Sequence, residues 1–143
     1  MTIVFFTDRD LGKLFPAVLR DAGLTVERHA DHFSPTTPDE EWLAETARRG
    51  WVAITHDRRI RYKPNELEAV AYHNVGLLVV IGAAPHGDLA RSFVVTAPRI
   101  ISFIEVQQRP FIAKVYRGPA STPSRSSAVL PGRVELWYPA LSR

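Results

Sequence analysis

Thr2–Asp10, T-I-V-F-F-T-D-R-D, is the stretch of sequence that decides the fold. Its centre, Ile3–Phe6, is a continuous apolar run, which is typical of a strand buried on both faces of a parallel sheet. The run is followed by two acids, Asp8 and Asp10. In open α/β sheets, ligands bind beyond the carboxyl ends of the strands, so these acids are well placed for a metal or for acid–base chemistry. The alternative is turn chemistry, in which either acid caps a helix that begins near Leu11.

Strands and helices alternate along the rest of the chain. The further predicted strands are Leu24–Arg28, Trp51–Thr55, Val75–Ile81, Phe111–Tyr116 and Arg133–Tyr138. The predicted helices are Leu11–Ala22, Asp39–Gly50, Asn65–His73, Asp88–Val95 and Ala97–Gln108. The last two are separated because Pro98 inside a helix costs about 3 kcal/mol.

This alternation predicts an α/β fold, a three-layer α/β/α sandwich with a mostly parallel central sheet of about five strands. The last two strands are expected to form an antiparallel hairpin at the edge of the sheet. We expect a single domain over residues 1–143, with a core at 2–116, a loop at 117–132 and the edge strand at 133–138.

The composition narrows the classes of function. The chain has 143 residues, 45% of them hydrophobic and 23% charged, and a net charge of +3, which favours anionic partners mildly. It contains no cysteine, which excludes disulfides, thiolate zinc sites and cysteine catalysis and is compatible with the cytoplasm. No signal peptide is recognised, and the longest apolar run, Val75–Ala84, is too short to span a bilayer.

Three acids are expected to meet at one edge of the sheet. Asp8 ends the first strand, Asp57 follows the third, and Asp39 opens the helix that leads into the third strand. Two carboxylates 4 Å apart repel each other by on the order of 4 kcal/mol at an effective dielectric constant near 20. A site of this kind therefore needs a proton or a cation, and oxygen ligands without cysteine suit Mg²⁺ or Mn²⁺.

Four basic residues follow Asp57 closely. They are Arg58, Arg59, Arg61 and Lys63. Beside an acidic site they are candidates to hold the phosphates of a polyanion, although a solvated charged surface is the alternative for each of them. His29 and His32 could suggest zinc, but no further ligands follow at a recognisable spacing, and a polar loop is the better interpretation.

Four motifs together resemble the PIN-like nuclease superfamily, and more closely the VapC-type toxins of toxin–antitoxin pairs. They are Asp8-Arg9-Asp10-Leu11, Gly23-Leu24-Thr25-Val26, Asp39-Glu40-Glu41-Trp42 and Ile54-Thr55-His56-Asp57. Each motif is weak alone, but their order and spacing are fairly specific, and the resemblance covers residues 2–116.

The resemblance implies a metal-dependent endoribonuclease, the toxin of a type II pair, that hydrolyses RNA with Mg²⁺ or Mn²⁺. Asp8, Asp39 and Asp57 would be the catalytic, metal-binding acids, and Glu40 could assist or replace Asp39. Thr55 would support Asp57, and we interpret Asp10 as a capping or supporting residue. The resemblance implies RNA and a cognate antitoxin as partners. It is compatible with a homodimer, and it implies no contact with a membrane.

The chain departs from the family pattern in one respect. PIN nucleases usually carry a fourth acid after the fourth strand, where this chain offers only Asp88, which could simply cap a helix. One alternative is therefore a catalytically degenerate PIN-like module that binds nucleic acid or a partner. Another is a phosphatase-like hydrolase with Asp8 as nucleophile and Asp10 as general acid, but Gly12 stands where that family has Thr or Val.

Overall fold

The computed structural model describes residues 2–119 and 129–139. Met1, residues 140–143 and residues 120–128, which belong to the expected loop 117–132, lie outside the described part. Among the described residues, no helix combines the length and the apolar character needed to cross a membrane.

Within the described residues, the strands form one six-stranded sheet in the order β2-β1-β3-β4-β5-β6. The strands are β1 Val4–Thr7, β2 Thr25–Arg28, β3 Val52–Thr55, β4 Gly76–Ile81, β5 Phe111–Tyr116 and β6 Val134–Tyr138. The first five are parallel, and β6 runs antiparallel to β5 at the edge. The predicted mostly parallel sheet with a C-terminal edge hairpin is thus confirmed.

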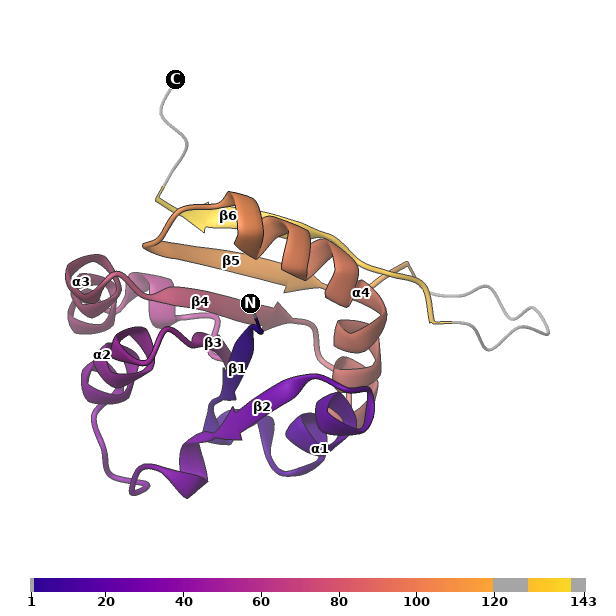
Figure 1. Ribbon diagram of the computed structural model, residues 1–143, viewed down its shortest axis with the longest axis horizontal. Coiled ribbons are helices and arrows are strands. Elements are labelled where there is room, and N and C mark those ends of the chain that lie inside the picture. Colours follow the sequence, from indigo (N-terminus) through magenta and orange to yellow (C-terminus); the bar gives the residue numbers. More distant parts are fainter. Residues whose placement is uncertain (1, 120–128, 140–143) are drawn as a thin grey trace.

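Helices cover both faces of this sheet, as predicted (Figure 1). They are α1 Leu14–Asp21, α2 Asp39–Arg48, α3 Pro64–His73 and α4 His86–Val106, with short 3₁₀ turns η1 Arg9–Leu11, η2 His29–Asp31 and η3 Ile60–Tyr62. The helices α1 and α4 pack on one face, and α2 and α3 pack on the other.

The first strand shows why both faces are buried. Phe5 and Phe6 are adjacent, so their side chains point to opposite faces of the sheet. Phe5 packs edge-to-face on Phe93 of α4 with ring centroids 5.6 Å apart, and Phe6 stacks on Trp42 of α2 at the same distance. Burying each phenylalanine contributes roughly 1.5–3 kcal/mol, so these two residues fix β1 between the helical layers.

Helix α4 corrects the prediction of two helices separated at Pro98. The helix is continuous from His86 to Val106, with Pro98 inside it. Pro98 is exposed, whereas Thr96, Ala97 and Ile100 are buried against the sheet. Packing of this face outweighs the local cost of the proline, whose ring points to solvent.

The first predicted helix, Leu11–Ala22, was also wrong at its start. The chain makes the turn η1, passes through Gly12 with φ of 68°, and begins α1 only at Leu14. A Cβ on Gly12 would lie 2.9 Å from Nδ1 of His86, so the glycine permits both the left-handed backbone and the close approach of α4.

The edge strand β6 is tied to α4 at its start. The Gly132 N–H donates to Oγ1 of Thr96 (3.0 Å), and Arg99 Nη1 donates to the Gly132 carbonyl (2.7 Å). A Cβ on Gly132 would overlap the Tyr116 carbonyl, so only glycine fits here. These contacts hold the hairpin against the helical layer.

Candidate functional site

The carboxyl ends of the inner strands β1, β3 and β4 meet at one edge of the sheet. The Asp8 N–H donates to the Ile54 carbonyl (2.9 Å), which fixes the residue after β1 against β3. His56 follows β3, and its Nε2 lies 2.8 Å from the carbonyl of Gly82, which follows β4. Because a carbonyl only accepts, this nitrogen carries the proton.

Asp8 and Asp10 share the hydroxyl of Thr55. Thr55 Oγ1 lies 2.8 Å from Oδ2 of Asp8 and 3.1 Å from Oδ2 of Asp10. Since a hydroxyl has one proton, it serves one carboxylate at a time. Asp10 also accepts the His56 N–H (3.0 Å), while Asp8 accepts the Arg9 N–H (2.7 Å) and thereby caps η1. Of the two roles expected for Asp10, capping is taken by Asp8, whereas the contacts of Asp10 with Thr55 and His56 agree with a supporting role.

The pKa values of both carboxyl groups are raised. Burial, together with the neighbouring charge of Asp10, raises the pKa of Asp8 to about 6. Burial also raises the pKa of Asp10, against the effect of the hydrogen bonds from His56 and Thr55. A cation beside this pair would relieve the repulsion and the cost of burying charge.

Asp57 and Asp39 are linked by a lysine. Lys63 Nζ lies 2.6 Å from Oδ2 of Asp57 and 4.0 Å from Oδ2 of Asp39. Although burial acts in the opposite direction, the hydrogen bonds from Lys63 and from the Arg59 N–H hold the pKa of Asp57 below its usual value. The expected hydrogen bond between Thr55 and Asp57 is present, with the Asp57 N–H as donor and the Thr55 hydroxyl as acceptor (3.2 Å), while the hydroxyl proton serves Asp8 or Asp10.

Asp39 stands in the first turn of α2, where a negative charge is stabilised by the helix dipole. Its Oδ1 accepts a hydrogen bond from Nε1 of the buried Trp42 (2.9 Å), which orients the carboxylate. Its negative charge contributes to the raised pKa of Asp8, in agreement with a place at the same edge. Glu40 lines a separate hollow between α2 and α3, together with Asn65.

The four basic residues after Asp57 lie in different surroundings. Arg58 and Arg59 are exposed and line a depression of about 680 Å³ whose other lining residues are Asp8, Asp10, His56 and Asp57. Arg61 packs over the ring of Tyr138 at 5.2 Å, and Lys63 contacts the acids. Of the four, Arg58 and Arg59 border this depression.

The two histidines that suggested zinc have other partners. Nδ1 of the buried His29 accepts a hydrogen bond from Nε of Arg9 (2.9 Å), and burial lowers its pKa. His32 Nε2 lies 2.9 Å from Glu27. These contacts agree with the preferred interpretation of a polar loop.

The candidate fourth acid, Asp88, lies in the first turn of α4 and pairs with Arg91. It belongs neither to the depression that Asp8 lines nor to the ion pairs of Lys63. The first turn of α4 does approach the site through His86, whose ring centroid lies 6.5 Å from that of His56.

The acids fit a divalent cation in part. Asp8 and Asp10 offer hard oxygen donors that share one hydroxyl, and burial raises the pKa of both carboxyl groups. Within the described ranges, however, no group of three or more such side chains is gathered closely enough to hold a metal ion. The third and fourth carboxylates, Asp57 and Asp39, face Lys63 instead.

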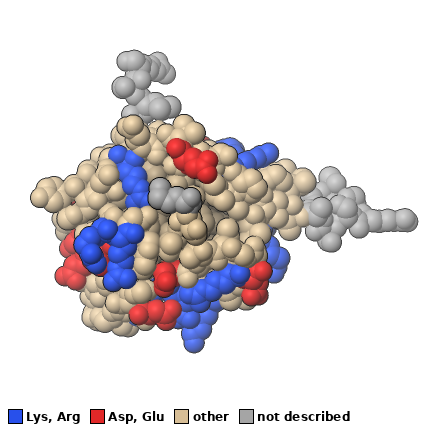
Figure 2. Space-filling model, in the orientation of Figure 1, with Lys and Arg blue, Asp and Glu red and all other residues tan. Residues whose placement is uncertain are grey.

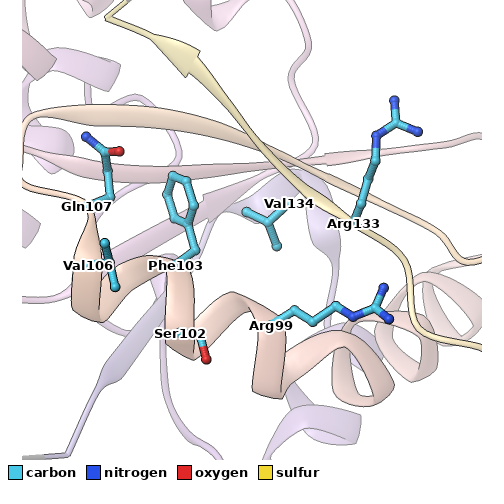
Figure 3. A pocket seen from close by; sticks show the side chains of 7 residues that line it. All are labelled: Arg99, Ser102, Phe103, Val106, Gln107, Arg133 and Val134. Atoms are coloured by element: carbon cyan, nitrogen blue, oxygen red, sulfur yellow. The ribbon is translucent and has the colours of Figure 1, made fainter. Parts of the chain in front are cut away.

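Another hollow lies between the C-terminal half of α4 and the start of β6 (Figure 3). It measures about 470 Å³ and is mostly apolar, with Phe103, Val106 and Val134 in its lining and Arg99 and Arg133 at one end (Figure 3). It contains no acid and so offers no counterpart to the chemistry of Asp8 and Asp10.

Sequence reasoning assigned Lys63 to RNA and missed its contacts with the acids, and it missed the backbone and ring contacts of His56. The Lys63–Asp57 pair spans η3, a 3₁₀ turn of only three residues, which is too short to leave a periodic pattern in the sequence.

Residues 3–82 match the family described as "PIN like domain". The chain is 36% identical over 70 residues to the "Putative ribonuclease VapC45" of Mycobacterium tuberculosis (strain ATCC 25618 / H37Rv). That match covers 46% of this chain and 51% of the relative, so the chain spans about half the length of the curated relative it matches. No solved structure matches the chain. The family match includes β1 to β4 and every acid discussed above except Asp88, and it extends over more than half of the residues. The chain therefore belongs to the PIN-like domain family.

Proposed function

We propose that this protein is a metal-dependent endoribonuclease of the VapC type that hydrolyses RNA phosphodiesters. The observation that carries the proposal is the pair Asp8 and Asp10, held on one hydroxyl at the carboxyl edge of the sheet beside Arg58 and Arg59. The membership of the PIN-like family and the name of the mycobacterial relative support it. We also propose that residues 1–143 form one domain, because a single sheet extends from β1 to β6.

In this proposal, Asp8 and Asp10 hold Mg²⁺ or Mn²⁺, with Asp57 and Asp39 as further ligands and Glu40 as an assisting acid. The bound ion would polarise the phosphoryl oxygen and lower the pKa of a bound water. Thr55 keeps Asp8 and Asp10 together, and Trp42 orients Asp39. Arg58 and Arg59 bind the phosphates on either side of the scissile bond, while Arg61 and Lys63 contribute positive charge close by.

A partner and a location follow from the same proposal. An RNase toxin must be restrained in its own cell, so we propose a cognate antitoxin in the cytoplasm, and a homodimer as the functional unit. A short reading frame for a DNA-binding protein directly beside this gene would support the antitoxin. Its absence from the gene's neighbourhood in several genomes would count against the pairing.

The test is cleavage of end-labelled single-stranded RNA with Mg²⁺ or Mn²⁺. We expect the wild type to cleave, and Asp8→Asn and Asp57→Asn to lose most activity, on the order of 10²-fold or more, because removing a ligand weakens charge stabilisation in the transition state. Asp21→Asn is the matched control, since Asp21 is exposed at the end of α1. Equal cleavage by all four proteins contradicts the site.

One observation favours a second function. Lys63 neutralises Asp57, and no set of three acids is gathered for a metal among the described residues. This arrangement suits a degenerate PIN-like module that binds RNA without cleaving it. Binding of labelled RNA by the wild type, with no cleavage under any metal, would support the module over the nuclease.

A further inference from the structure

Lys63 occupies a fixed position between two elements. It is the N-cap residue of α3, and Pro64 at the first helical position restricts the backbone around it. From there its ammonium reaches Asp57 after β3 (2.6 Å) and Asp39 at the start of α2 (4.0 Å). One lysine thus joins two carboxylates that are far apart in the sequence.

These contacts differ from an ordinary surface ion pair. The side chains of Lys63 and Asp57 are only 35% and 20% exposed, so water screens them incompletely. Arg59 offers a comparison on the same carboxylate. It lies 3.6 Å from Oδ1 of Asp57, but its side chain is 84% exposed. Lys63 is therefore the principal cation of this acid pair.

The ammonium of Lys63 already occupies carboxylate oxygens that a metal ion would need as ligands. Oδ2 of Asp57 is engaged by Lys63, and Oδ1 accepts the Arg59 N–H (3.0 Å). Asp8 and Asp10, in contrast, have no cation within ion-pairing distance among the described residues. The four acids are thus divided into a pair without a cation and a pair that shares the single positive charge of Lys63.

We propose that Lys63 is a resident counter-ion that holds Asp39 and Asp57 while no metal is bound and competes with the metal for them. This inference rests on the proposed function in one respect, namely that these acids are metal ligands. Lys63 acts as a positioning residue: it keeps the acids of the metal-free protein together, and it weakens the binding of Mg²⁺ or Mn²⁺.

The first test is calorimetric titration of Mn²⁺ into wild type, Lys63→Met, Lys63→Arg and the control Arg48→Met. Methionine keeps much of the aliphatic length of lysine and removes the charge. We expect Lys63→Met to bind Mn²⁺ roughly three- to tenfold more tightly than wild type, the range for loss of a half-buried charge partner. Lys63→Arg should stay near wild type because it keeps the charge. Arg48→Met, the control at an exposed arginine that pairs with Glu45 on α2, should change the affinity less than about twofold.

The second test needs no tight binding. In EDTA, Lys63→Met should unfold at a lower urea concentration than wild type, because it leaves two carboxylates without their cation. Saturating Mn²⁺ should raise the midpoint of the variant more than that of wild type and close the gap. A variant that is as stable as wild type in EDTA would overturn the role of Lys63 as counter-ion.

Asp8→Asn separates the two hypotheses. If wild type binds Mn²⁺ and Asp8→Asn does not, the metal site stands, and an unchanged or weaker affinity in Lys63→Met then overturns the counter-ion alone. If wild type, Lys63→Met and Asp8→Asn all fail to bind Mn²⁺, the metal-dependent function fails and the competition fails with it.

Discussion

At the residue scale, the ionisation of Asp8 opposes folding when no cation is present. Its pKa in the folded protein is about 6, above the ordinary value of 3.8. An acid whose pKa is raised by folding contributes its full stabilisation of the folded state at low pH, where it is protonated in both the folded and the unfolded protein. This contribution is lost as the pH rises through 6. At neutral pH the buried charge is therefore a net cost.

We predict that Asp8→Asn stabilises the metal-free protein at about pH 7.5. The gain should be roughly 1–2 kcal/mol in the free energy of unfolding, less than the full pKa shift implies because part of the carboxyl reaches water. The gain should vanish near pH 4. Urea unfolding in EDTA at several pH values measures it.

Asp57→Asn is the control with the opposite sign. The pKa of Asp57 is lowered in the folded protein, so its contribution to stability is present above its ordinary pKa and is lost as the pH falls. We expect this variant to be less stable than wild type at neutral pH, with a gap that narrows in acid. The same pH trend in both variants would contradict the division of the acids into two pairs.

The sequence predicts which acids meet at the edge of the sheet, but not the partner of each acid. Asp8, Asp39 and Asp57 reach one edge because strand ends and a helix start must lie there in a parallel sheet, which follows from topology alone. The partner of each carboxylate did not follow from topology. Lys63 reaches Asp57 across η3, and a turn of three residues is too short to show the periodic pattern from which helices and strands are predicted.

At the element scale, the continuous helix α4 shows where local propensity fails. Pro98 predicts a break, yet the buried side chains around it hold the helix together. The strands were easier to predict, because apolar runs buried on both faces leave few alternatives. Their bounds agree with the sequence to within a residue or two, whereas the start of α1 depended on the contact of Gly12 with His86, which lies far away in the sequence.

We predict that Pro98→Ala stabilises the protein. The change restores an N–H that can donate to the Val94 carbonyl and removes the steric conflict of the ring with the preceding turn. We expect a gain of about 1–3 kcal/mol in the free energy of unfolding, measured with urea. Ser102→Ala, an exposed change on the same helix, should alter it by less than about 0.5 kcal/mol. A loss of stability in Pro98→Ala would show that the helix is adapted to the proline.

At the scale of the whole molecule, charge decides how RNA is held. The net charge is only +3, and on the face shown in Figure 2 acidic and basic side chains lie interspersed. A broad field that attracts RNA over the whole surface is therefore absent from that face. Binding should depend on a few cations near the acids, above all Arg58 and Arg59.

We predict that the double variant Arg58→Gln/Arg59→Gln, made in the inactive Asp8→Asn background, weakens RNA binding and its salt dependence. Removal of one cation from a phosphate should reduce the slope of log K against log salt by about 0.7, hence by about 1.4 for both arginines. Fluorescence anisotropy with labelled RNA at several salt concentrations measures this slope. Arg48→Gln/Arg49→Gln is the control, because these arginines pair with Glu45 on α2. An equal effect of both double substitutions would contradict a local binding surface.

The shared hydroxyl of Thr55 also affects how the molecule is made. The hydroxyl contacts Asp8 and Asp10, which precede Thr55 by 47 and 45 positions in the sequence. The site therefore does not exist in any short fragment of the chain. Closing so long a loop is slow compared with forming a helix, and the reward comes only when β1 and β3 have paired. We therefore expect the acids to meet only when β1 and β3 pair, in the cooperative step that forms the centre of the sheet. A nascent or partly unfolded chain has no assembled site, and correct folding is itself the first control on the proposed activity.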